Sequence, residues 1–364
     1  MIDYTSSTQG MSIAIIGDGA WGTALALLLH AKQFDVRVWG AFPDYTKDLI
    51  ATRQNYKYLP GVPLPSDLPF SNDLGAVLAG ARLVVMAVPS HFMREVAARV
   101  KQALPEPAPF VTVAKGLEGG TLKRMSQVIQ EEIGLPQVAA LSGPSHAEEV
   151  ARRMPTAVTA ASQQMNLATF VQEVFSCDFF RVYSNTDIVG VELCATLKNI
   201  IAIAAGAVDG CGFGDNAKSA LLTRALVEMA RFGTAMGGQV ESFFGLAGVG
   251  DLITTAFSKH SRNRAFGERI AQGMSVDDAL HASLGVVEGY RNTKSIHELA
   301  QRVGIDMPVT EAVYQVLYHG KDIRSMSVEL MRREPKSERA AGSAVRKWLK
   351  LLWLRLRVTL MTGS

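Results

Sequence analysis

Apolar residues in the first half of the chain occur in short runs, and each run is followed by a polar or glycine-rich cluster. Short continuous apolar runs that alternate with helical patterns predict buried strands of a parallel sheet. We therefore expect an α/β domain with 179–183 as its last strand and the proline-rich stretch 59–65 as a surface loop. The earlier strands are predicted at 12–16, 35–39, 82–88, 110–114 and 137–141.

The second half of the chain shows helical periodicity instead. From about Asp187, apolar side chains recur at three- and four-residue spacing, as in helices with one buried face. A second helix is predicted over 217–236, and the glycine-rich segment 209–216 is expected to be a loop between helices. Because 364 residues are too many for one ordinary core, we predict domains over 1–185 and 186–335, followed by a tail over 336–364.

A glycine-rich turn follows the first predicted strand. Gly17, Gly19 and Gly22 form the pattern G-x-G-x-x-G around Ala20 and Trp21, directly before a helix-forming stretch. Glycines at these positions let the backbone approach a pyrophosphate, and the helix N-terminus offers free amides and partial positive charge. The first domain is therefore predicted to be a Rossmann-type dinucleotide-binding domain, and the second all-α.

The acidic residue that usually accompanies this turn is missing. An acidic residue that binds the ribose of NAD is expected about twenty positions after the first glycine. The second strand ends instead in Trp39-Gly40-Ala41-Phe42, with neither an acid for NAD nor an arginine for the phosphate of NADP. Arg37 and Lys47 are nearby, but surface roles explain both equally well. The pattern leaves the choice between NAD and NADP open.

Lys198 lies on the apolar stripe of the first helix in the second domain. A buried lysine is rare unless it is paired, because an ammonium loses its hydration. Lys198 therefore either extends to solvent or occupies an internal polar site, where burial lowers its pKa toward values useful in acid–base catalysis. Its neighbours at helical spacing are Val191, Cys194, Leu197, Ile201, Ala202 and Ala205.

Polar clusters follow three further strands, at 89–91, 115–118 and 142–147. Because ligands of parallel α/β sheets bind beyond the carboxyl ends of the strands, we expect these clusters to line one crevice. Lys115 either binds an anionic ligand there or is a solvated loop lysine. We expect His91 and His146 to be hydrogen-bonded loop or helix-cap histidines.

Two clusters in the helical half contain candidate binding residues. Asp251 follows a glycine-rich segment and is either a turn former or a carboxylate that orients a buried lysine. Ser261 is placed to cap a helix whose first turn contains Arg262 and Asn263. Helix amides and a guanidinium at such a position would hold a phosphate; an ordinary capped helix with surface arginines is the alternative.

Composition and charge bear on the partners and the cellular location that we expect for the chain. The formal net charge of +3 is small and gives no reason to expect a nucleic-acid partner. The cysteines Cys177, Cys194 and Cys211 form no CxxC pair, which argues against disulfides and a zinc site and favours a cytoplasmic location. The first ten residues lack the apolar core of a signal peptide.

Together these segments resemble the bacterial-type NAD(P)-dependent glycerol-3-phosphate dehydrogenases over about residues 12–335. The resemblance implies a homodimer and reversible hydride transfer between NAD(P)H and dihydroxyacetone phosphate, giving sn-glycerol 3-phosphate for phospholipid synthesis. No metal is implied. The segments that carry it are GDGAWGTALA, AVPSH, AKGLE, LSGPSHA, YSNTDIVGVEL, LKNIIAIAAGAVDGCGFGDNAKSALLTR, GLAGVGDLITT, SRNRAFG and VVEGYRNTK.

The resemblance also implies roles for individual residues. Lys198 matches the residue that transfers a proton to and from the carbonyl oxygen. The matching substrate contacts are Lys115, Gly143, Ser145, Asp251, Ser261, Arg262 and Asn263. The matching cofactor contacts are Gly17, Gly19, Ala20, Trp21, Gly22, Lys115, Ala147, Arg262, Val286 and Glu288. Such a site would lie between the two domains.

The tail has no counterpart in this resemblance. Residues 343–361 interleave aliphatic residues and tryptophan with arginine and lysine, a pattern that fits a helix lying on an anionic membrane. Packing against a second subunit or an end without fixed structure are the alternatives. For the whole chain, the alternatives are a dehydrogenase acting on a hydroxy acid or sugar nucleotide, and a catalytically silent nucleotide-binding sensor.

Overall fold

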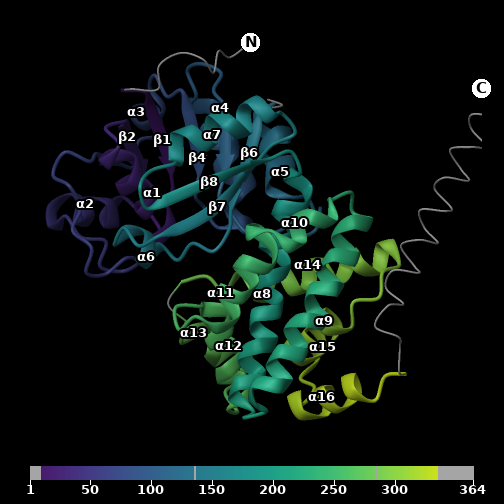
Figure 1. The fold of residues 1–364 in the computed structure, drawn as a ribbon. Helices are drawn as coiled ribbons and strands as arrows, with labels where there is room; N and C mark the ends of the chain where they lie inside the picture. Colours follow the sequence, from purple (N-terminus) through teal and green to yellow (C-terminus); the bar gives the residue numbers. More distant parts are fainter. Residues whose placement is uncertain (1–9, 135–136, 284, 335–364) are drawn as a thin grey trace, which may run out of the picture.

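The computed structural model describes residues 10–134, 137–283 and 285–334. They form a sheet with helices on both of its faces and, below it in the view, a cluster of helices (Figure 1). The predicted Rossmann-type domain followed by an all-α domain is confirmed. The predicted tail at 336–364 lies outside the described residues.

The sheet has eight strands in the order β3-β2-β1-β4-β5-β6-β7-β8. Neighbouring strands are parallel except β6 and β7, which are antiparallel. The chain order reverses between β1 and β4, and in such sheets the ligand crevice opens at this point. The strands are β1 (Ser12–Ile16), β2 (Asp35–Trp39), β3 (Phe70–Ser71), β4 (Leu83–Met86), β5 (Phe110–Thr112), β6 (Val138–Ser142), β7 (Thr156–Ala161) and β8 (Phe180–Asn185).

Helices cover both faces of the sheet and make up the rest of the chain. The sheet part contains α1 (Ala20–Ala31), α2 (Pro43–Thr52), α3 (Leu74–Leu78), the short turn η1 (Ser90–Phe92), α4 (Met93–Ala103), α5 (Met125–Ile133), α6 (Ala147–Ala151) and α7 (Met165–Phe175). The helical part contains α8 (Ile188–Gly210), α9 (Gly214–Ala235), α10 (Val240–Phe244), the π-helical turn η2 (Leu246–Gly250), α11 (Asp251–Phe257), α12 (Arg262–Ala271), α13 (Val276–His281), α14 (Glu288–Val303), α15 (Pro308–His319) and α16 (Ile323–Met331).

The apolar strands are buried on both faces, which explains their continuous hydrophobic runs. In β1, Ile13 and Ile15 join the core under α1, α6 and α7, while Ala14 and Ile16 join the opposite core under α3, α4 and α5. Successive side chains of a strand point to opposite faces. Both layers of the sheet part are therefore built from the same short runs.

Helix α8 is the central element of the helical part. Its mean hydropathy of 1.8 and its length would suffice for a membrane span, but 89% of that apolar window is buried. The segment Val240–Phe257 is also long and apolar enough to span a membrane, and 44% of its apolar window is buried. The burial of α8 and its place among the other helices in Figure 1 identify it as a core helix of this domain.

Helices α8 and α12 meet backbone to backbone. A methyl group added at Gly206 would lie 1.9 Å from the carbonyl oxygen of Arg264, and one added at Gly267 would lie 2.0 Å from that of Ile203. The two glycines therefore permit a separation that any larger residue would prevent. This contact holds the first turn of α12 beside Asn199, the residue that follows Lys198.

A buried carboxylate joins the two parts at the side of α5. Glu192 of α8 accepts hydrogen bonds from Ser126, through the amide at 2.8 Å and the hydroxyl at 2.6 Å, and pairs with Arg124. Glu192 is 4% exposed. A carboxylate this buried is tolerated only with such partners. The interface between α8 and α5 therefore contains matched polar contacts in addition to apolar packing.

The structure differs from the sequence predictions at several segments. Strands β3 and β7 were not predicted. Segment 209–216 is mostly helix, because α8 continues to Gly210 and α9 begins at Gly214. The proline-rich stretch is a loop, but Leu59 in it is fully buried and anchors it to the core. The change from strand to helix, between Asn185 and Ile188, lies beside the domain boundary predicted at 185.

Candidate active site

The glycine-rich turn connects β1 to α1 and has the close contacts that glycine permits. Gly17 has φ of +126°, and a methyl group on it would lie 2.5 Å from the carbonyl oxygen of Ala87. A methyl group on Gly22 would lie 2.0 Å from the carbonyl oxygen of Gly17. Gly19 is the N-cap of α1 and makes no side-chain hydrogen bond, so the first amides of the helix are left without a side-chain partner from the cap. The backbone is thus arranged for a phosphate group.

Lys198, Asp251 and Lys115 form one ion-pair cluster between the two parts of the chain. Lys198 Nζ lies 2.6 Å from Asp251 Oδ1, and Lys115 Nζ lies 2.8 Å from Asp251 Oδ2. Lys198 is 5% and Asp251 2% exposed, whereas 19% of the Lys115 side chain is exposed. Lys198 therefore occupies an internal polar site, and Asp251 orients it. Lys115 reaches the same carboxylate from the end of β5.

The environment of the cluster shifts the protonation of both buried groups. Burial lowers the pKa of the Lys198 ammonium to about 7, although the carboxylate of Asp251 opposes this change. Burial alone would raise the pKa of Asp251, but the ammonium groups of Lys115 and Lys198 hold it below its ordinary value. At neutral pH the cluster therefore contains a carboxylate and a lysine that exchanges its proton readily.

Thr255 belongs to the cluster and was not predicted. Its Oγ1 accepts a hydrogen bond from Lys198 Nζ at 2.7 Å and donates one to the carbonyl oxygen of Asp251 at 2.6 Å. The four-residue spacing between Asp251 and Thr255 places both on one face of α11. That spacing was a usable signal once Asp251 was a candidate. The π-helical turn η2 directly precedes this face, and such turns are frequent at functional sites.

The loop after β6 brings Gly143 and Ser145 to Lys115. Lys115 Nζ donates to the carbonyl oxygen of Gly143 at 3.4 Å, and Ser145 Oγ donates to the same oxygen at 3.0 Å. A methyl group on Gly143 would lie 2.8 Å from Cα of Val158, so β7 packs directly against this loop. Ala147 begins α6 and packs in the same core as Ala20 and Trp21.

The first turn of α12 has the predicted cap. Ser261 accepts a hydrogen bond from the amide of Arg264 at 3.2 Å, and Arg262 is exposed beside Gly285. Asn263 is engaged differently: its Nδ2 donates to Asn199 at 3.0 Å, and its Oδ1 accepts from the amide of Gly289 at 2.9 Å. Asn263 thus fixes α12 against α8 and α14.

The start of α14 contacts the loops after β4 and β5. Glu288 accepts hydrogen bonds from the amide and hydroxyl of Ser90, at 3.2 and 2.7 Å. Burial raises the pKa of Glu288. Asn292 is fully buried and donates to the carbonyl oxygen of Lys115 at 3.1 Å. Val286 is half-buried just before the helix. Ser90 belongs to the cluster 89–91 that was predicted to line the crevice, but its pairing with Glu288 was not predicted, and neither was Asn292, which no local pattern marks.

His91 lies in the turn η1 and His146 is the N-cap of α6, as predicted for loop or helix-cap histidines, but one nitrogen of each ring lacks the expected hydrogen bond in the part of the chain that the structure describes. Nδ1 of His91 and Nε2 of His146 are buried without a hydrogen-bond partner among the described residues. Burial lowers the pKa of His91 to about 4. Burial also lowers the pKa of His146, and Lys198 and Lys115 add to this effect. Both rings are therefore neutral at pH 7, with a buried nitrogen at the edge of the site.

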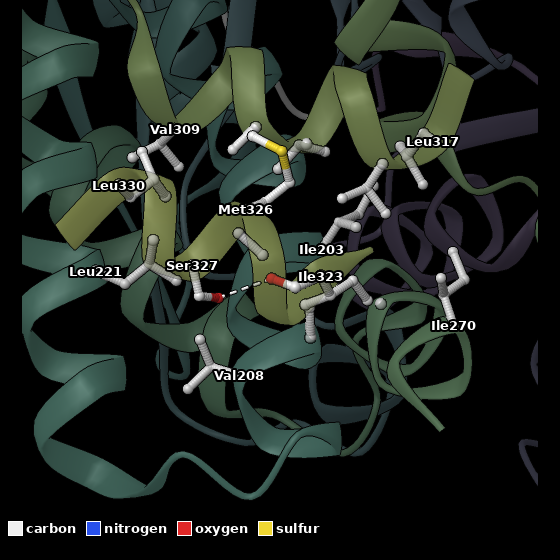
Figure 2. A pocket seen from close by; sticks show the side chains of 16 residues that line it. Ile203, Val208, Leu221, Ile270, Val309, Leu317, Ile323, Met326, Ser327 and Leu330 are labelled. Carbon is white, nitrogen blue, oxygen red and sulfur yellow. Dashed lines mark hydrogen bonds between the residues drawn. The ribbon is translucent and has the colours of Figure 1, made fainter. Parts of the chain in front are cut away.

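An apolar cavity of about 70 Å³ lies elsewhere, among α8, α9, α12, α15 and α16 (Figure 2). Its lining includes Ile203, Leu221 and Met326, and the hydroxyl of Ser327 is turned to the carbonyl oxygen of Ile323 at 2.9 Å. No predicted site residue lines it. The cavity therefore lies apart from the site described above.

Within the described ranges, no group of three or more histidine, cysteine, aspartate or glutamate side chains is placed to hold a metal ion. Cys177, Cys194 and Cys211 are free thiols. The site is therefore made of lysines, carboxylates, hydroxyls and loop backbone.

Known proteins share this fold and sequence over most of the chain. A glycerol-3-phosphate dehydrogenase (NAD(P)+) of Moorella thermoacetica is 50% identical over 331 residues, which cover 91% of this chain and 98% of its own. One of Geobacillus thermodenitrificans is 49% identical over 330 residues, 90% of this chain and 96% of its own. The crystal structure of glycerol-3-phosphate dehydrogenase from Coxiella burnetii superimposes with a TM-score of 0.86 at 40% identity, covering 90% of this chain and 100% of that one.

The two halves of the chain match the two parts of one family. Residues 12–168 match the family described as NAD-dependent glycerol-3-phosphate dehydrogenase N-terminus, and residues 187–327 match the corresponding C-terminus. These ranges contain the glycine-rich turn and Lys115 in the first part and Lys198, Asp251 and Arg262 in the second. The chain therefore belongs to the family of NAD(P)-dependent glycerol-3-phosphate dehydrogenases.

Proposed function

We propose that this chain catalyses reversible hydride transfer between NAD(P)H and dihydroxyacetone phosphate, giving sn-glycerol 3-phosphate for phospholipid synthesis, with Lys198 as general acid and base. The observation that carries this proposal is a buried lysine with a pKa of about 7, held by Asp251 beside Lys115. A general acid works best when its pKa lies near the working pH. Family membership supplies the substrate class.

Lys198 would protonate the carbonyl oxygen during reduction and take the proton back during oxidation. Asp251 and Thr255 fix the direction of its Nζ through hydrogen bonds of 2.6 and 2.7 Å. The carboxylate also favours the charged form that reduction requires. Lys115 neutralises the second oxygen of Asp251 and places a positive charge at the substrate. These contacts would position the proton donor before the substrate arrives.

The substrate phosphate would bind at the first turn of α12. Ser261, Arg262 and Asn263 are supported as substrate residues by family matching, together with Lys115, Gly143, Ser145 and Asp251. Arg262 is exposed and free to turn toward a ligand, whereas Asn263 would act by holding α12 in place. A guanidinium paired with a phosphate forms strong charge-assisted hydrogen bonds.

The cofactor residues fit a dinucleotide. Gly17, Gly19, Ala20, Trp21 and Gly22 form a turn in which the first amides of α1 have no side-chain partner from the cap, and Nε1 of Trp21 is buried without a hydrogen-bond partner in the described ranges. We expect further cofactor contacts from five residues that match contacts of the family: Lys115, Ala147, Arg262, Val286 and Glu288. When bound, the nicotinamide supplies or accepts the hydride.

The direct test measures oxidation of NADH and of NADPH, in parallel, by near-ultraviolet absorbance with dihydroxyacetone phosphate as substrate. Turnover supports the proposal. If neither cofactor is oxidised although both bind, the chain is a nucleotide-binding sensor or acts on another substrate, and the proposal fails.

The pH dependence should have opposite signs in the two directions. Below its pKa of about 7 Lys198 carries the proton that reduction consumes, so kcat/KM for dihydroxyacetone phosphate should fall above about pH 7. Oxidation of glycerol 3-phosphate needs the neutral amine and should speed up through the same pH. Initial rates in both directions test this. An inflection of the same sign in both would indicate titration of the substrate phosphate instead.

Arg262→Ala should weaken phosphate recognition. The loss of a charge-assisted hydrogen bond should raise KM for dihydroxyacetone phosphate roughly tenfold to hundredfold. Because Arg262 also matches a cofactor contact, rates are measured at saturating cofactor, where the rate with dihydroxyacetone, which lacks the phosphate, should fall much less. Arg269→Ala on the same helix, where Arg269 bonds to Ser283, is the matched control. Equal losses with both substrates would place Arg262 elsewhere in the mechanism.

We further propose that the chain forms a homodimer in the cytoplasm, with domains over 1–185 and 186–335. We also propose that residues 343–364 make a peripheral contact with a membrane. The dimer is supported by family membership, and the membrane contact by the basic amphipathic pattern of the tail. Co-sedimentation with anionic liposomes, with and without residues 343–364, tests the membrane contact. Equal binding of both forms contradicts it.

A further inference from the structure

The end of β2 is where Rossmann-type domains place the carboxylate that binds the adenosine ribose. Here the strand ends in Trp39, which is 1% exposed and donates its indole hydrogen to the carbonyl oxygen of Asn72 at 3.0 Å. Gly40, Ala41 and Phe42 follow and carry no charge. The usual position therefore has no group that would recognise the ribose or a phosphate attached to it.

A carboxylate reaches this position from a different element. A methyl group added at Gly40 would lie 2.5 Å from Oδ2 of Asp18 and 2.5 Å from Oγ1 of Thr46. Asp18 belongs to the glycine-rich turn, between Gly17 and Gly19. Its carboxylate thus occupies the space that a side chain at the end of β2 would fill. Glycine at position 40 is what makes room for it.

The backbone of Asp18 is fixed in the turn, but one oxygen of its carboxylate lacks a hydrogen-bond partner among the described residues. The carbonyl oxygen of Asp18 accepts hydrogen bonds from Thr23 at 3.1 Å and from Asn55 at 2.8 Å, which fix the residue in the turn. Asp18 is only 6% exposed, and its Oδ2 has no hydrogen-bond partner within the described ranges. Burial raises the pKa of Asp18 to about 6, and nearby Lys57 opposes this only in part. A buried carboxyl oxygen without a donor requires an explanation, and a donor on a bound dinucleotide is one that the position at the end of β2 supplies.

The basic residues around the end of β2 are engaged elsewhere. Arg37 pairs with Asp35 at 2.7 Å and also donates to the carbonyl oxygen of Ala79. Lys57 lies over the rings of Tyr45 and Tyr58. Arg99 lies over the ring of Trp39, with 5.0 Å between Cζ and the ring centroid. None of these three basic residues forms an ion pair with the carboxylate of Asp18 within the described ranges.

We propose that Asp18 accepts a hydrogen bond from the 2′-hydroxyl of the adenosine ribose and thereby makes the enzyme selective for NAD(H) over NADP(H). This inference rests on the proposed function for its cofactor class. The 2′-phosphate of NADP(H) has no hydroxyl to donate at that position, and its charge would be repelled by a carboxylate. The acid that is missing from the end of β2 is thus supplied by the first turn.

Direct binding tests this without any substrate. Fluorescence titration should give dissociation constants for NADH and NADPH with the full chain, Asp18→Asn and Asp18→Ala. The unchanged protein should bind NADH at least about tenfold more tightly than NADPH. Asp18→Ala, which removes the acceptor, should weaken NADH binding by about tenfold or more. Asp18→Asn should strengthen NADPH binding, because it removes the repulsion.

Asp44→Asn is the matched control, since it removes the same charge from a fully exposed side chain on the neighbouring helix α2. It should leave the ratio of the two dissociation constants unchanged. Thermal melts establish that each variant is folded. Preference of the unchanged protein for NADPH, or an unaltered ratio in both folded Asp18 variants, overturns the proposal. Because binding is measured apart from turnover, an altered ratio without activity on dihydroxyacetone phosphate would overturn the proposed reaction but not the role of Asp18.

Discussion

Lys198→Met is expected to lower kcat for dihydroxyacetone phosphate by about 10³- to 10⁴-fold, the full contribution of a positioned proton donor. Methionine fills the same apolar space, and Asp251 keeps Lys115 as its partner at 2.8 Å. The variant should therefore fold and bind NADH with near-normal affinity. Steady-state kinetics and a cofactor titration on the same preparation separate the two effects.

Lys218→Met is the matched control for this prediction. Lys218 is also 5% exposed and paired, at 2.8 Å, with Asp209, but it belongs to α9 and lies outside the cluster of Asp251. Its replacement should reduce thermal stability without changing kcat by more than about twofold, because it makes no contact with the reacting groups. If Lys198→Met retained more than a tenth of the turnover, another group would be the proton donor.

Asp251→Asn is expected to change both the rate and its pH dependence. Without the carboxylate, two ammonium groups face each other, and the pKa of Lys198 should fall below its present value of about 7 by roughly one to three units. At pH 7 Lys198 would then be mostly neutral, so reduction should slow by about 10²-fold and its inflection should move to lower pH. The complete pH profile is the measurement that shows this.

Asp209→Asn provides the comparison, because Asp209 also bridges two cations, Lys218 at 2.8 Å and Arg264 at 2.7 Å. Loss of either carboxylate should destabilise the fold, for the fully buried Asp251 by about 3–5 kcal/mol. Of the two variants, only Asp251→Asn should shift the inflection in the pH profile of the reduction rate. An unshifted profile in a folded Asp251→Asn protein would mean that the titrating group is not Lys198.

The parts of the site that could be predicted are those with a local pattern. The glycine-rich turn follows an apolar run, and Lys198 interrupts an apolar stripe. Both features follow from short-range geometry, in which a helix or strand repeats within a few residues. Asp251 was a candidate to orient a lysine for the same reason, since a carboxylate can make that lysine tolerable in a core.

The remaining parts depend on contacts between residues distant in sequence. Ser90 meets Glu288 across 198 positions, and Asn292 meets the carbonyl of Lys115 across 177. Periodicity carries no information about such pairs. Strand β7 was missed because three of its six residues are alanine, which is not typical of strands.

The buried carboxylate of Glu192 has a consequence for how the enzyme unfolds. Separating α8 from α5 would break the bonds of Glu192 to Ser126 and Arg124, and Lys115 would lose Asp251 in the same movement. It would also expose the apolar core that α8 shares with Leu117, Ala140 and Ala161 of the sheet part. Neither half then has a low-energy state without the other. Thermal unfolding should accordingly be a single cooperative transition. The half that binds the nucleotide and the half that contains Lys198 should therefore unfold together, at one melting temperature.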